Sequence, residues 1–501
     1  MQNGQLIAAI DLGSNSFRLE IGIFEDGHIR RVEYLKETVR QGNGLDADRL
    51  LSNEAMVRGW ECLARFSERL SGFAPKHVRA VATQTLREAK NRDDFLVQAE
   101  KTLGFPIEVI SGREEARLIY AGVVNLLPQS NEKRLVVDIG GRSTEMILGQ
   151  GFKPKTMESY RVGSVKWSMK YFADGQFSPS SFEWAEVAAK AVLDEALALY
   201  PHAAWDVAYG SSGTIGAVSD VLHAAGWPED IITREGLDWL KEKLIKAGRA
   251  DALRLEGVKE DRKPVIGGGL AVLCALFDLM KIDTMHAAQG ALRHGVLYDL
   301  VQREHSTDLR SAMVTALGNR FAVDKAQAER VQKTALKLFK SLQDKSSCDT
   351  DNAARLEKKL NWAASLLEIG TRISHSDFHK HGAYILDNAD LPGFSMSELH
   401  RLSQLILGHR GKLKKLELEL KNHEFMIQLL SLRMASILCH ARRDPDLKGF
   451  SLKYKDGTSS ELVIQCKKSW VQLWPQSAHL LREECLAWQK TPWQIAFSET
   501  A

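Results

Sequence analysis

Two short segments of this 501-residue chain each place an aspartate at the end of an apolar run and small, hydrogen-bonding residues directly after it. The first reads DLGSNSFRL from Asp11, and the second reads DIGGRSTEM from Asp138. Backbone N–H groups in such turns bind phosphate oxygens, and Ser, Thr and Asn side chains add further donors. Because an aspartate repels a phosphate unless a divalent cation lies between them, the pattern indicates a phosphate site that contains Mg²⁺.

A single segment of this kind is explained equally well by an Asx-type turn at the end of a strand. The second segment changes this balance, because it repeats the order apolar strand, aspartate, glycine-containing turn, Ser or Thr, apolar strand. The distance between the two copies is that of one small domain rather than of a short solenoid repeat. We therefore expect two related domains that face each other across a cleft, with one turn on each wall.

A carboxylate suited to general-base catalysis occurs in VISGREEARLIYAGV, residues 109–123. Ser111 is a predicted helix N-cap, and Glu114 stands at the capping-box position, from which its side chain would reach back to the helix start. Glu115 has no such structural role and would take a proton from water if it faces the cleft. The alternative is a solvated glutamate that the helix N-terminus stabilises.

Three more segments carry residue types suited to anion binding. In VATQTLREAKN, residues 81–91, Arg87 follows a strand and a threonine-rich turn, where a guanidinium can bind a phosphate bidentately; the alternative is an ordinary surface arginine. The glycine-rich runs YGSSGTIGAV, residues 209–218, and PVIGGGLAV, residues 264–272, each follow apolar residues. Both runs are expected to form loops that face the ligand.

The composition is that of an ordinary globular protein and excludes several other classes. The 67 basic and 64 acidic residues give a net charge of +3, which argues against a nucleic-acid partner. The six cysteines lie far apart and form no CxxC pair, so we expect reduced thiols in a cytoplasmic protein. The N-terminus shows no signal-peptide pattern.

The longest apolar stretch, residues 265–277, is too short to span a bilayer. It is expected to form a buried core helix, so we expect no stable membrane insertion, while a peripheral association with a membrane stays open.

The order of the predicted elements supports an α/β fold. Residues 1–305 alternate short β-rich runs with helical ones, beginning with a strand before Asp11 and a hairpin around Asp26-Gly27. Residues 306–443 show helical periodicity throughout. Residues 444–501 indicate two strands around Asp456-Gly457 followed by a helix, which together form a small α+β module.

In combination, these segments resemble the exopolyphosphatase / guanosine pentaphosphate phosphohydrolase family. The segments that carry the resemblance are, in order along the chain, DLGSNSFRL, VRQGNGLD, ATQTLREAKN, VISGREEARLIYAGV, VVDIGGRSTEM, YGSSGTI and HGAYILDNADLPGF. The resemblance implies two ribonuclease-H-like lobes of the actin-like ATPase type around a cleft, residues 1–125 and 126–305. It further implies an all-α HD-like domain, residues 306–443, and a small C-terminal α+β domain, residues 444–501.

The resemblance also implies a role for each candidate residue. Glu115 corresponds to the catalytic base. Asp138 and Glu145 correspond to the acidic residues that hold Mg²⁺ and orient water, with Asp11 on the opposite wall. The implied phosphate-binding residues are Ser14, Asn15, Ser16, Arg87, Gly140, Gly141, Ser143 and Thr144. A monovalent cation such as K⁺ is a further expectation.

The chain departs from the family pattern at three places. Arg142 stands where the family has a small residue, and it would either add a phosphate contact or narrow the cleft. His294 replaces a glutamate, so no role is assigned to residues 290–298. Leu367 and Glu368 stand in place of the His-Asp pair of a metal-dependent HD phosphohydrolase. The nearby histidines are therefore expected to be remnants or phosphate contacts rather than a metal site: His375, His379, His381 and His409.

Together these features predict an exopolyphosphatase, which releases orthophosphate from the end of inorganic polyphosphate by Mg²⁺-assisted in-line attack of a water that Glu115 activates. A guanosine pentaphosphate 5′-phosphohydrolase that uses the same site is the alternative, and a catalytically inactive sensor of polyphosphate or nucleotide is a remoter one. A polyphosphate chain needs a basic path out of the cleft; the candidates are Lys153, Lys155, Arg161, Lys166, Lys170, the KLKK run at 412–415, Arg442 and Arg443. A homodimer is expected from the resemblance alone.

Overall fold

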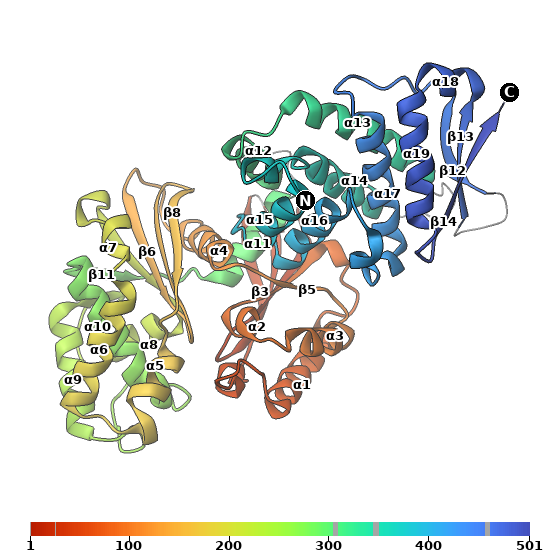
Figure 1. Ribbon diagram of the computed structural model, residues 1–501. Helices are drawn as coiled ribbons and strands as arrows, with labels where there is room; N and C mark the ends of the chain where they lie inside the picture. The colour runs from red at the N-terminus through yellow and green to blue at the C-terminus, as the bar shows by residue number, and fades with distance from the viewer. Residues whose placement is uncertain (1, 26, 304–308, 344–349, 456–460, 501) are drawn as a thin grey trace. The chain divides into compact units, whose positions relative to one another are not determined.

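The computed structural model describes residues 2–25, 27–303, 309–343, 350–455 and 461–500 (Figure 1). Two compact units divide the chain. The first contains the residues up to 308 together with Asp390–Ser395, and the second contains the rest. A short segment from the C-terminal half of the sequence therefore belongs to the first unit. The bounds of the four predicted domains stay predictions.

The first unit begins with a five-stranded sheet in the order β3-β2-β1-β4-β5. Strands β1, β2 and β3 form an antiparallel meander, whereas β4 runs parallel to β1 and β5 parallel to β4. The strands are β1 (Gln5–Leu12), β2 (Phe17–Glu25), β3 (His28–Glu37), β4 (Val78–Ala82) and β5 (Ile107–Val109). The predicted hairpin joins β2 to β3, where Gly27 has a φ of +84°, a conformation that glycine adopts without strain; Asp26 lies outside the described residues.

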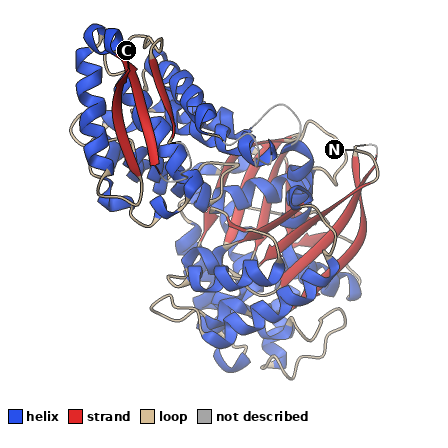
Figure 2. Ribbon diagram, turned by 90° about the vertical axis from the view of Figure 1, so that its right-hand side faces the viewer, coloured by secondary structure: helices blue, strands red, loops and turns tan. Residues whose placement is uncertain are grey.

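A second sheet repeats this topology. Its order is β10-β11-β9-β6-β7-β8, in which β8-β7-β6-β9-β11 has the same directions as the first sheet and β10 adds an antiparallel edge. The strands are β6 (Lys133–Ile139), β7 (Thr144–Gln150), β8 (Lys153–Tyr160), β9 (Val207–Ser211), β10 (Ile231–Thr233) and β11 (Thr284–Ala287). The predicted α/β class, with two related lobes, is confirmed. Figure 2 shows the strands of each sheet side by side.

The helices of the first unit connect these strands. They are α1 (Asn53–Arg69), α2 (Gln84–Glu88), α3 (Arg92–Leu103), α4 (Gly112–Val124), α5 (Ser164–Tyr171), α6 (Pro179–Leu193), α7 (Ala196–Leu199), α8 (Ser212–Ala224), α9 (Arg234–Ala247), α10 (Ile266–Met280) and α11 (Leu292–Arg303). A short 3₁₀ helix, η1 (Gln41–Gly44), follows β3.

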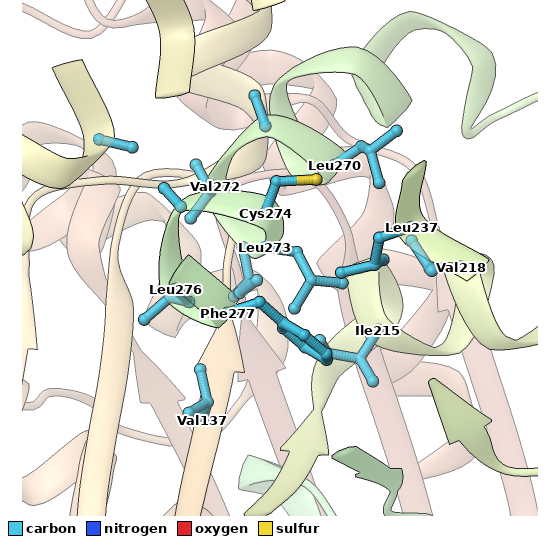
Figure 3. Packing of buried hydrophobic residues seen from close by; sticks show 14 of the residues in the cluster. Val137, Ile215, Val218, Leu237, Leu270, Val272, Leu273, Cys274, Leu276 and Phe277 are labelled. Atoms are coloured by element: carbon cyan, nitrogen blue, oxygen red, sulfur yellow. The ribbon is translucent and has the colours of Figure 1, made fainter. Parts of the chain in front are cut away.

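Strand β6 is buried on both faces, as the central strand of a covered sheet must be. Leu135, Val137 and Ile139 contribute to one hydrophobic core, and the intervening Val136 contributes to another. The first core is built around α10, whose Leu273 and Phe277 lie among side chains of α8 and α9 (Figure 3). The second core combines residues of both sheets with α4 and α11, so these two helices join the lobes.

Helix α10 confirms the predicted core helix, but it corrects the prediction of a ligand-facing glycine loop at 264–272. Gly268 lies inside the helix, and a Cβ added there would be 2.4 Å from the backbone nitrogen of Ser168 in α5. The glycines therefore allow two helix backbones to approach each other. The stretch Lys263–Met280 is long and apolar enough to cross a membrane, yet 78% of it is buried inside the protein, as expected of a core helix.

The backbones of α4 and α11 approach each other closely at two glycines. A Cβ added to Gly122 would lie 2.1 Å from the carbonyl oxygen of Ala291, and one added to Gly295 would lie 1.7 Å from that of Leu118. Any side chain at either position would separate the helices. The segment 290–298, to which the sequence assigned no role, thus fixes the position of α4.

The second unit is helical and ends in a three-stranded sheet in the order β12-β13-β14. Its helices are α12 (Leu309–Arg320), α13 (Lys325–Leu342), α14 (Thr350–Ser365), α15 (Phe378–Asp387), α16 (Met396–Gly408), α17 (His423–Leu438), α18 (Lys468–Leu473) and α19 (Pro475–Trp488), and its strands are β12 (Phe450–Tyr454), β13 (Glu461–Lys467) and β14 (Gln494–Thr500). The third strand was not predicted, and the turn at Asp456-Gly457 lies outside the described residues.

The HD-like region holds buried histidines but no gathered ligand set. Burial lowers the pKa of His379 to about 4 and that of His409 to about 3, so both are neutral near pH 7. Glu368, at the position of the missing aspartate, accepts a hydrogen bond from Arg442 over 2.7 Å. Among the described residues of the whole chain, no three His, Cys, Asp or Glu side chains gather as a metal site.

Candidate active site

A cavity of about 390 Å³ lies between the two sheets of the first unit. It is lined by the turns after β1 and β6 and by residues from β3, α4, the start of α8, the segment before α11 and the loop before α10. Nine of the predicted site residues line it: Asp11, Ser14, Asn15, Ser16, Glu115, Asp138, Gly140, Gly141 and Ser143. Two turns that are far apart in the sequence therefore meet at one cavity.

Glu115 lies in the first turn of α4, where Ser111 caps the helix by accepting a hydrogen bond from the Glu114 amide over 3.2 Å. Its side chain is buried, so the alternative of a solvated surface glutamate does not apply. Burial raises its pKa to about 7, and the charges of Asp11 and Asp138 add to this effect, which Arg87 only partly opposes. A carboxylate with this pKa can accept a proton from water near neutral pH.

Glu114 does not form the predicted capping box. Its carboxylate instead accepts hydrogen bonds from Arg117, at 2.8 Å to each of the two nitrogens, and from the backbone amide of Gly393 at 2.6 Å. Arg117 also donates to the carboxylate of Asp299 in α11 over 2.6 Å, and Arg79 of β4 donates to the Asp299 carboxylate over 2.7 Å. A fully buried carboxylate needs such compensation, because its desolvation is costly.

The turn after β1 presents unused donors to the cavity. The Nδ2 atom of Asn15 and the hydroxyl of Ser16 are buried and have no hydrogen-bond partner among the described residues. Ser14 is held by the Thr85 hydroxyl, which donates to its Oγ over 2.8 Å. Since buried polar groups are normally paired, Asn15 and Ser16 indicate a ligand with acceptor oxygens.

Three predicted site residues do not line the cavity. The hydroxyl of Thr144 donates to the carbonyl oxygen of Val162 over 2.7 Å, so it holds β7 in place. Glu145 is buried behind the cavity, and the Ser159 hydroxyl donates to it over 2.6 Å. Arg87 donates to the Ile110 carbonyl over 2.7 Å and to Glu115 over 3.1 Å. Direct phosphate or metal contacts by these residues stay predictions.

The acidic residues form one electrostatic group. Burial raises the pKa of Asp138 to about 6, and Asp11 adds to the shift. Burial and the charges of Glu115 and Asp138 likewise raise the pKa of Glu145. A cation would relieve this repulsion. The oxygen donors of Asp11 and Asp138 fit Mg²⁺, which is commonly held by one or two carboxylates together with water and substrate phosphates.

Sequence reasoning missed the cations of the cavity, which are not those predicted for a polyphosphate path. The lining includes Arg18, Lys36, Lys259, Arg262 and Arg293. Arg18 donates to Asp11 over 3.0 Å. Arg18 lies in β2 between the buried Phe17 and Leu19, and this apolar setting was a local signal for it. No local pattern marks Arg262, which lies in a loop.

The predicted glycine run at 209–218 lines the cavity and makes room there for the side chain of Arg262. Ser212, Gly213 and Thr214 line the cavity, as expected of a ligand-facing turn. A Cβ on Gly213 would lie 2.0 Å from the guanidinium of Arg262, so glycine leaves the space that this side chain occupies. Burial lowers the pKa of Arg262, and the nearby charge of Arg18 lowers it further. An anion between these two cations would remove their repulsion.

Comparison with known proteins identifies the chain's relatives. The model of the Ppx/GppA phosphatase family matches residues 22–304, and a model of domain III of that family matches residues 309–485. The chain belongs to the Ppx/GppA phosphatase family. It is a hydrolase that acts on phosphoanhydride bonds. The expected family is thus confirmed, and an inactive sensor is not supported.

Relatives in this family have been named for a nucleotide activity. A guanosine-5′-triphosphate,3′-diphosphate pyrophosphatase of Pseudoalteromonas translucida is 38% identical over 493 residues, covering 97% of each chain. A protein of the same name from Aeromonas hydrophila is 38% identical over 508 residues and covers 100% of each chain.

Solved structures in the family share the fold of a large part of the chain. An exopolyphosphatase from Cytophaga hutchinsonii aligns with a TM-score of 0.54 at 23% identity, covering 60% of this chain and 98% of that one. The Aquifex aeolicus family member aligns with a TM-score of 0.51 at 24% identity, covering 60% of this chain and 99% of that one. These likenesses support the actin-like lobes.

Proposed function

We propose that the chain is a guanosine pentaphosphate phosphohydrolase, which removes the terminal 5′-phosphate of guanosine 5′-triphosphate 3′-diphosphate. The observation that carries this proposal is that one cavity combines Glu115 and the two phosphate-binding turns with a second set of cations. Lys36, Lys259 and Arg262 come from β3 and from the loop before α10, away from the two turns in the sequence. A nucleotide with phosphates at both its 5′ and 3′ positions has one anionic group for the two turns and another for these three cations.

The names of the full-length relatives support this substrate rather than inorganic polyphosphate, which the sequence favoured. Tyr34 also lines the cavity, and the guanidinium of Arg293 lies over its ring at 4.6 Å. An aromatic ring beside cations provides a surface for a base or ribose, whereas a polyphosphate chain offers nothing apolar to bind there.

In the proposed reaction, the terminal phosphoryl group lies against the turns at Asn15 and Gly141. Glu115 accepts a proton from a water whose oxygen forms the new bond to phosphorus, while the bond to the bridging oxygen breaks and that oxygen leaves on the nucleoside tetraphosphate. The N–H groups and the unpaired donors of Asn15 and Ser16 stabilise the equatorial oxygens. Such a reaction depends on positioning of the water and phosphate and on charge stabilisation more than on covalent catalysis by the protein.

Mg²⁺ is part of this proposal. Asp138 and Asp11 would hold it, and contact between the ion and the buried Glu145 stays a prediction. The ion would neutralise charge on the phosphoryl oxygens. A contribution of K⁺ and a homodimer stay predictions.

Exopolyphosphatase activity is the second candidate, since the terminal-phosphate chemistry is the same and the cavity cations suit any polyanion. The test is to measure phosphate release from guanosine 5′-triphosphate 3′-diphosphate, long-chain polyphosphate and ATP in parallel, with Mg²⁺ and over a range of salt. We expect the guanosine substrate to have the highest kcat/KM. A higher kcat/KM for polyphosphate, with a steep loss of affinity in salt, would establish the second candidate. A preference for ATP would refute both.

The matched variant for this test is Arg262→Ala. It removes a cation from the cavity without touching Glu115 or the two turns. We therefore expect the variant to raise KM more for the guanosine substrate than for ATP. An equal effect on both substrates would exclude recognition of the 3′-diphosphate by Arg262.

A further inference from the structure

His294, which replaces a glutamate in the family pattern, takes over the place of that glutamate at the start of α11. The helix begins at Leu292, so His294 is its third residue. A glutamate at the third position typically accepts a hydrogen bond from the backbone amide of the residue before the helix, in a capping box. In this chain Nδ1 of His294 accepts that hydrogen bond, from the Ala291 amide over 3.1 Å. The start of α11 is therefore capped without the glutamate.

The bond at Nδ1 decides where the imidazole carries its proton. A backbone amide can only donate, so Nδ1 has no hydrogen and the ring proton is on Nε2. Nε2 lies 3.2 Å from Oε1 of Glu20 in β2, and it is the donor of this pair. An ionised glutamate has no hydrogen to donate. His294 thus supplies a donor that the family residue lacks.

Glu20 is a buried carboxylate in the middle of a strand. Its side chain is 3% exposed, and it also accepts a hydrogen bond from Nε of Arg293 over 2.6 Å. Burial raises the pKa of Glu20, but its interactions with His294 and Arg293 outweigh this, so that the pKa lies below its usual value and the carboxylate is ionised near pH 7. A buried charge needs such partners, because its desolvation is costly. The donor of His294 therefore stabilises the group to which Arg293 is attached.

The strand register places this carboxylate beside Tyr34. Glu20 of β2 pairs with Tyr34 of β3 in the antiparallel sheet, so the two side chains are direct neighbours on one face. The guanidinium of Arg293 lies over the Tyr34 ring at 4.6 Å, while its Nε atom is bound to Glu20. Two neighbouring side chains thus fix the orientation of Arg293. Arg18 and Lys36, two residues further along the same strands, form the next pair on this face.

The fixed guanidinium has donors left at the cavity. Arg293 and Tyr34 line the cavity, whereas Glu20 and His294 do not. In the part of the chain that the structure describes, Nε is the one nitrogen of Arg293 that forms a hydrogen bond, so Nη1 and Nη2 have none. Two such nitrogens match the oxygens of a phosphate group. Holding the side chain in place beforehand reduces the entropy that is lost when a ligand binds.

We propose that His294 is a positioning residue for substrate binding, which holds the carboxylate of Glu20 and through it Arg293. Arg293 thereby stays over Tyr34, with both Nη atoms left for a phosphate group of the substrate. This rests on the proposed function, in which the cations of the cavity bind the phosphates of guanosine 5′-triphosphate 3′-diphosphate. His294 does not touch the cavity, so its effect belongs in KM rather than in kcat.

The test compares His294→Glu with His294→Gln. Both new side chains are capping-box residues and can accept from the Ala291 amide, so both variants keep the start of α11. The amide of His294→Gln can also donate to Glu20, whereas His294→Glu places a second carboxylate beside it. For the guanosine substrate we expect His294→Glu to raise KM roughly tenfold, the effect of losing about one hydrogen bond to a charged group, with a much smaller change in kcat. His294→Gln should keep KM close to that of the wild type.

A second readout does not depend on turnover. The Kd of guanosine 5′-diphosphate 3′-diphosphate, measured by calorimetry, should rise in His294→Glu by about the same factor as KM and stay near the wild-type value in His294→Gln.

Two further variants keep the test decisive. Glu20→Gln keeps the size of the side chain but removes the charge that binds Nε of Arg293, so KM should rise in this variant even if His294→Glu fails to fold. The matched control is Glu25→Gln. Glu25 lies in the same strand and accepts from Nε of Arg30 over 3.0 Å, but it does not line the cavity, so KM should equal that of the wild type.

The inference and the proposed function can fail separately. An unchanged KM in folded His294→Glu and Glu20→Gln would overturn the inference and leave the proposed function intact. An equal rise of KM in His294→Glu and His294→Gln would also overturn it, because the donor to Glu20 would then not be the cause. Absence of turnover of the guanosine substrate by the wild type would instead refute the proposed function.

Discussion

The guanidinium of Arg87 donates a hydrogen bond to Oε2 of Glu115 over 3.1 Å. The same nitrogen, Nη1, also donates to the carbonyl oxygen of Ile110 over 2.7 Å, and Nε donates to Gln84 over 3.0 Å, so the position of the arginine relative to α4 is fixed. Arg87 therefore acts on the proposed base itself: it stabilises the ionised carboxylate against a burial that raises the pKa of Glu115 to about 7.

The first prediction concerns this pair and pH. A general base must be ionised, so turnover should rise with pH through about 7 and level off above it. Arg87→Ala removes the opposite charge, which raises the pKa of Glu115 further and moves the acidic limb of the kcat profile to higher pH. Arg113→Ala is the control, because Arg113 lies in the same turn of α4 as Glu115 but pairs with Glu158. If the acidic limb of the kcat profile lies at the same pH in the wild type and in Arg87→Ala, Arg87 does not set the pKa of Glu115.

The second prediction concerns Glu115 directly. Glu115→Gln keeps the size of the side chain but cannot accept the proton, so kcat should fall by about 10²–10⁴-fold. Binding of the guanosine substrate, measured by calorimetry, should be retained or strengthened because a buried negative charge is removed from a site for polyanions. A variant with near-normal turnover would exclude Glu115 as the base.

The two turns could be predicted because their signal is local. An apolar strand, an aspartate and a run of small polar residues are adjacent in the sequence, and the strand pairing follows from them. Asp11 pairs with Arg18 across β1 and β2, and Asp138 pairs with Glu145 at the corresponding positions of β6 and β7. The two similar segments therefore form strand pairs with the same register in the two sheets.

The remaining parts of the site depend on contacts between distant residues. Gly295 and Gly122 are separated in sequence, yet their backbone contact fixes α4 and buries Glu115. Lys36 and Arg262 come from elements whose local patterns predict only a strand and a loop. Their meeting in one cavity follows from the packing of two lobes, which periodicity does not encode.

The third prediction concerns the stability of the acidic group. The pKa of Asp138 is raised from 3.8 to about 6, so the folded state binds this proton more tightly than the unfolded chain does. The stability that this provides is complete below about pH 4 and is lost as the pH rises through about 6. Asp138→Asn removes the buried charge and should raise the free energy of unfolding at pH 8, by up to about 3 kcal/mol for a pKa shift of about two units. The thermal transition at pH 8 should rise with it. At pH 5 the gain should be smaller, and an equal gain at both values would contradict the assignment.

The fourth prediction concerns the buried network beneath the base. Glu114 is fully buried and binds Arg117 and the Gly393 amide, while both Arg79 and Arg117 bind Asp299 of α11. Glu114→Gln leaves two arginines with too little negative charge, and breaking a buried pair in this way costs about 3–5 kcal/mol. Because α4 carries Glu115, the variant should lose both stability and kcat, with the loss of kcat persisting well below the thermal transition.

The matched control is Glu108→Gln. Glu108 also pairs with Arg79, at 2.9 Å, but its side chain is 24% exposed and lies in β5 rather than in α4. Solvent can screen the charge that this variant leaves behind, so its effect on thermal stability should be smaller and its kcat close to that of the wild type. If the two variants lose kcat equally, the network contributes to the stability of the first unit without positioning Glu115. If only Glu114→Gln loses kcat, the buried network on α4 is part of what holds the base in place.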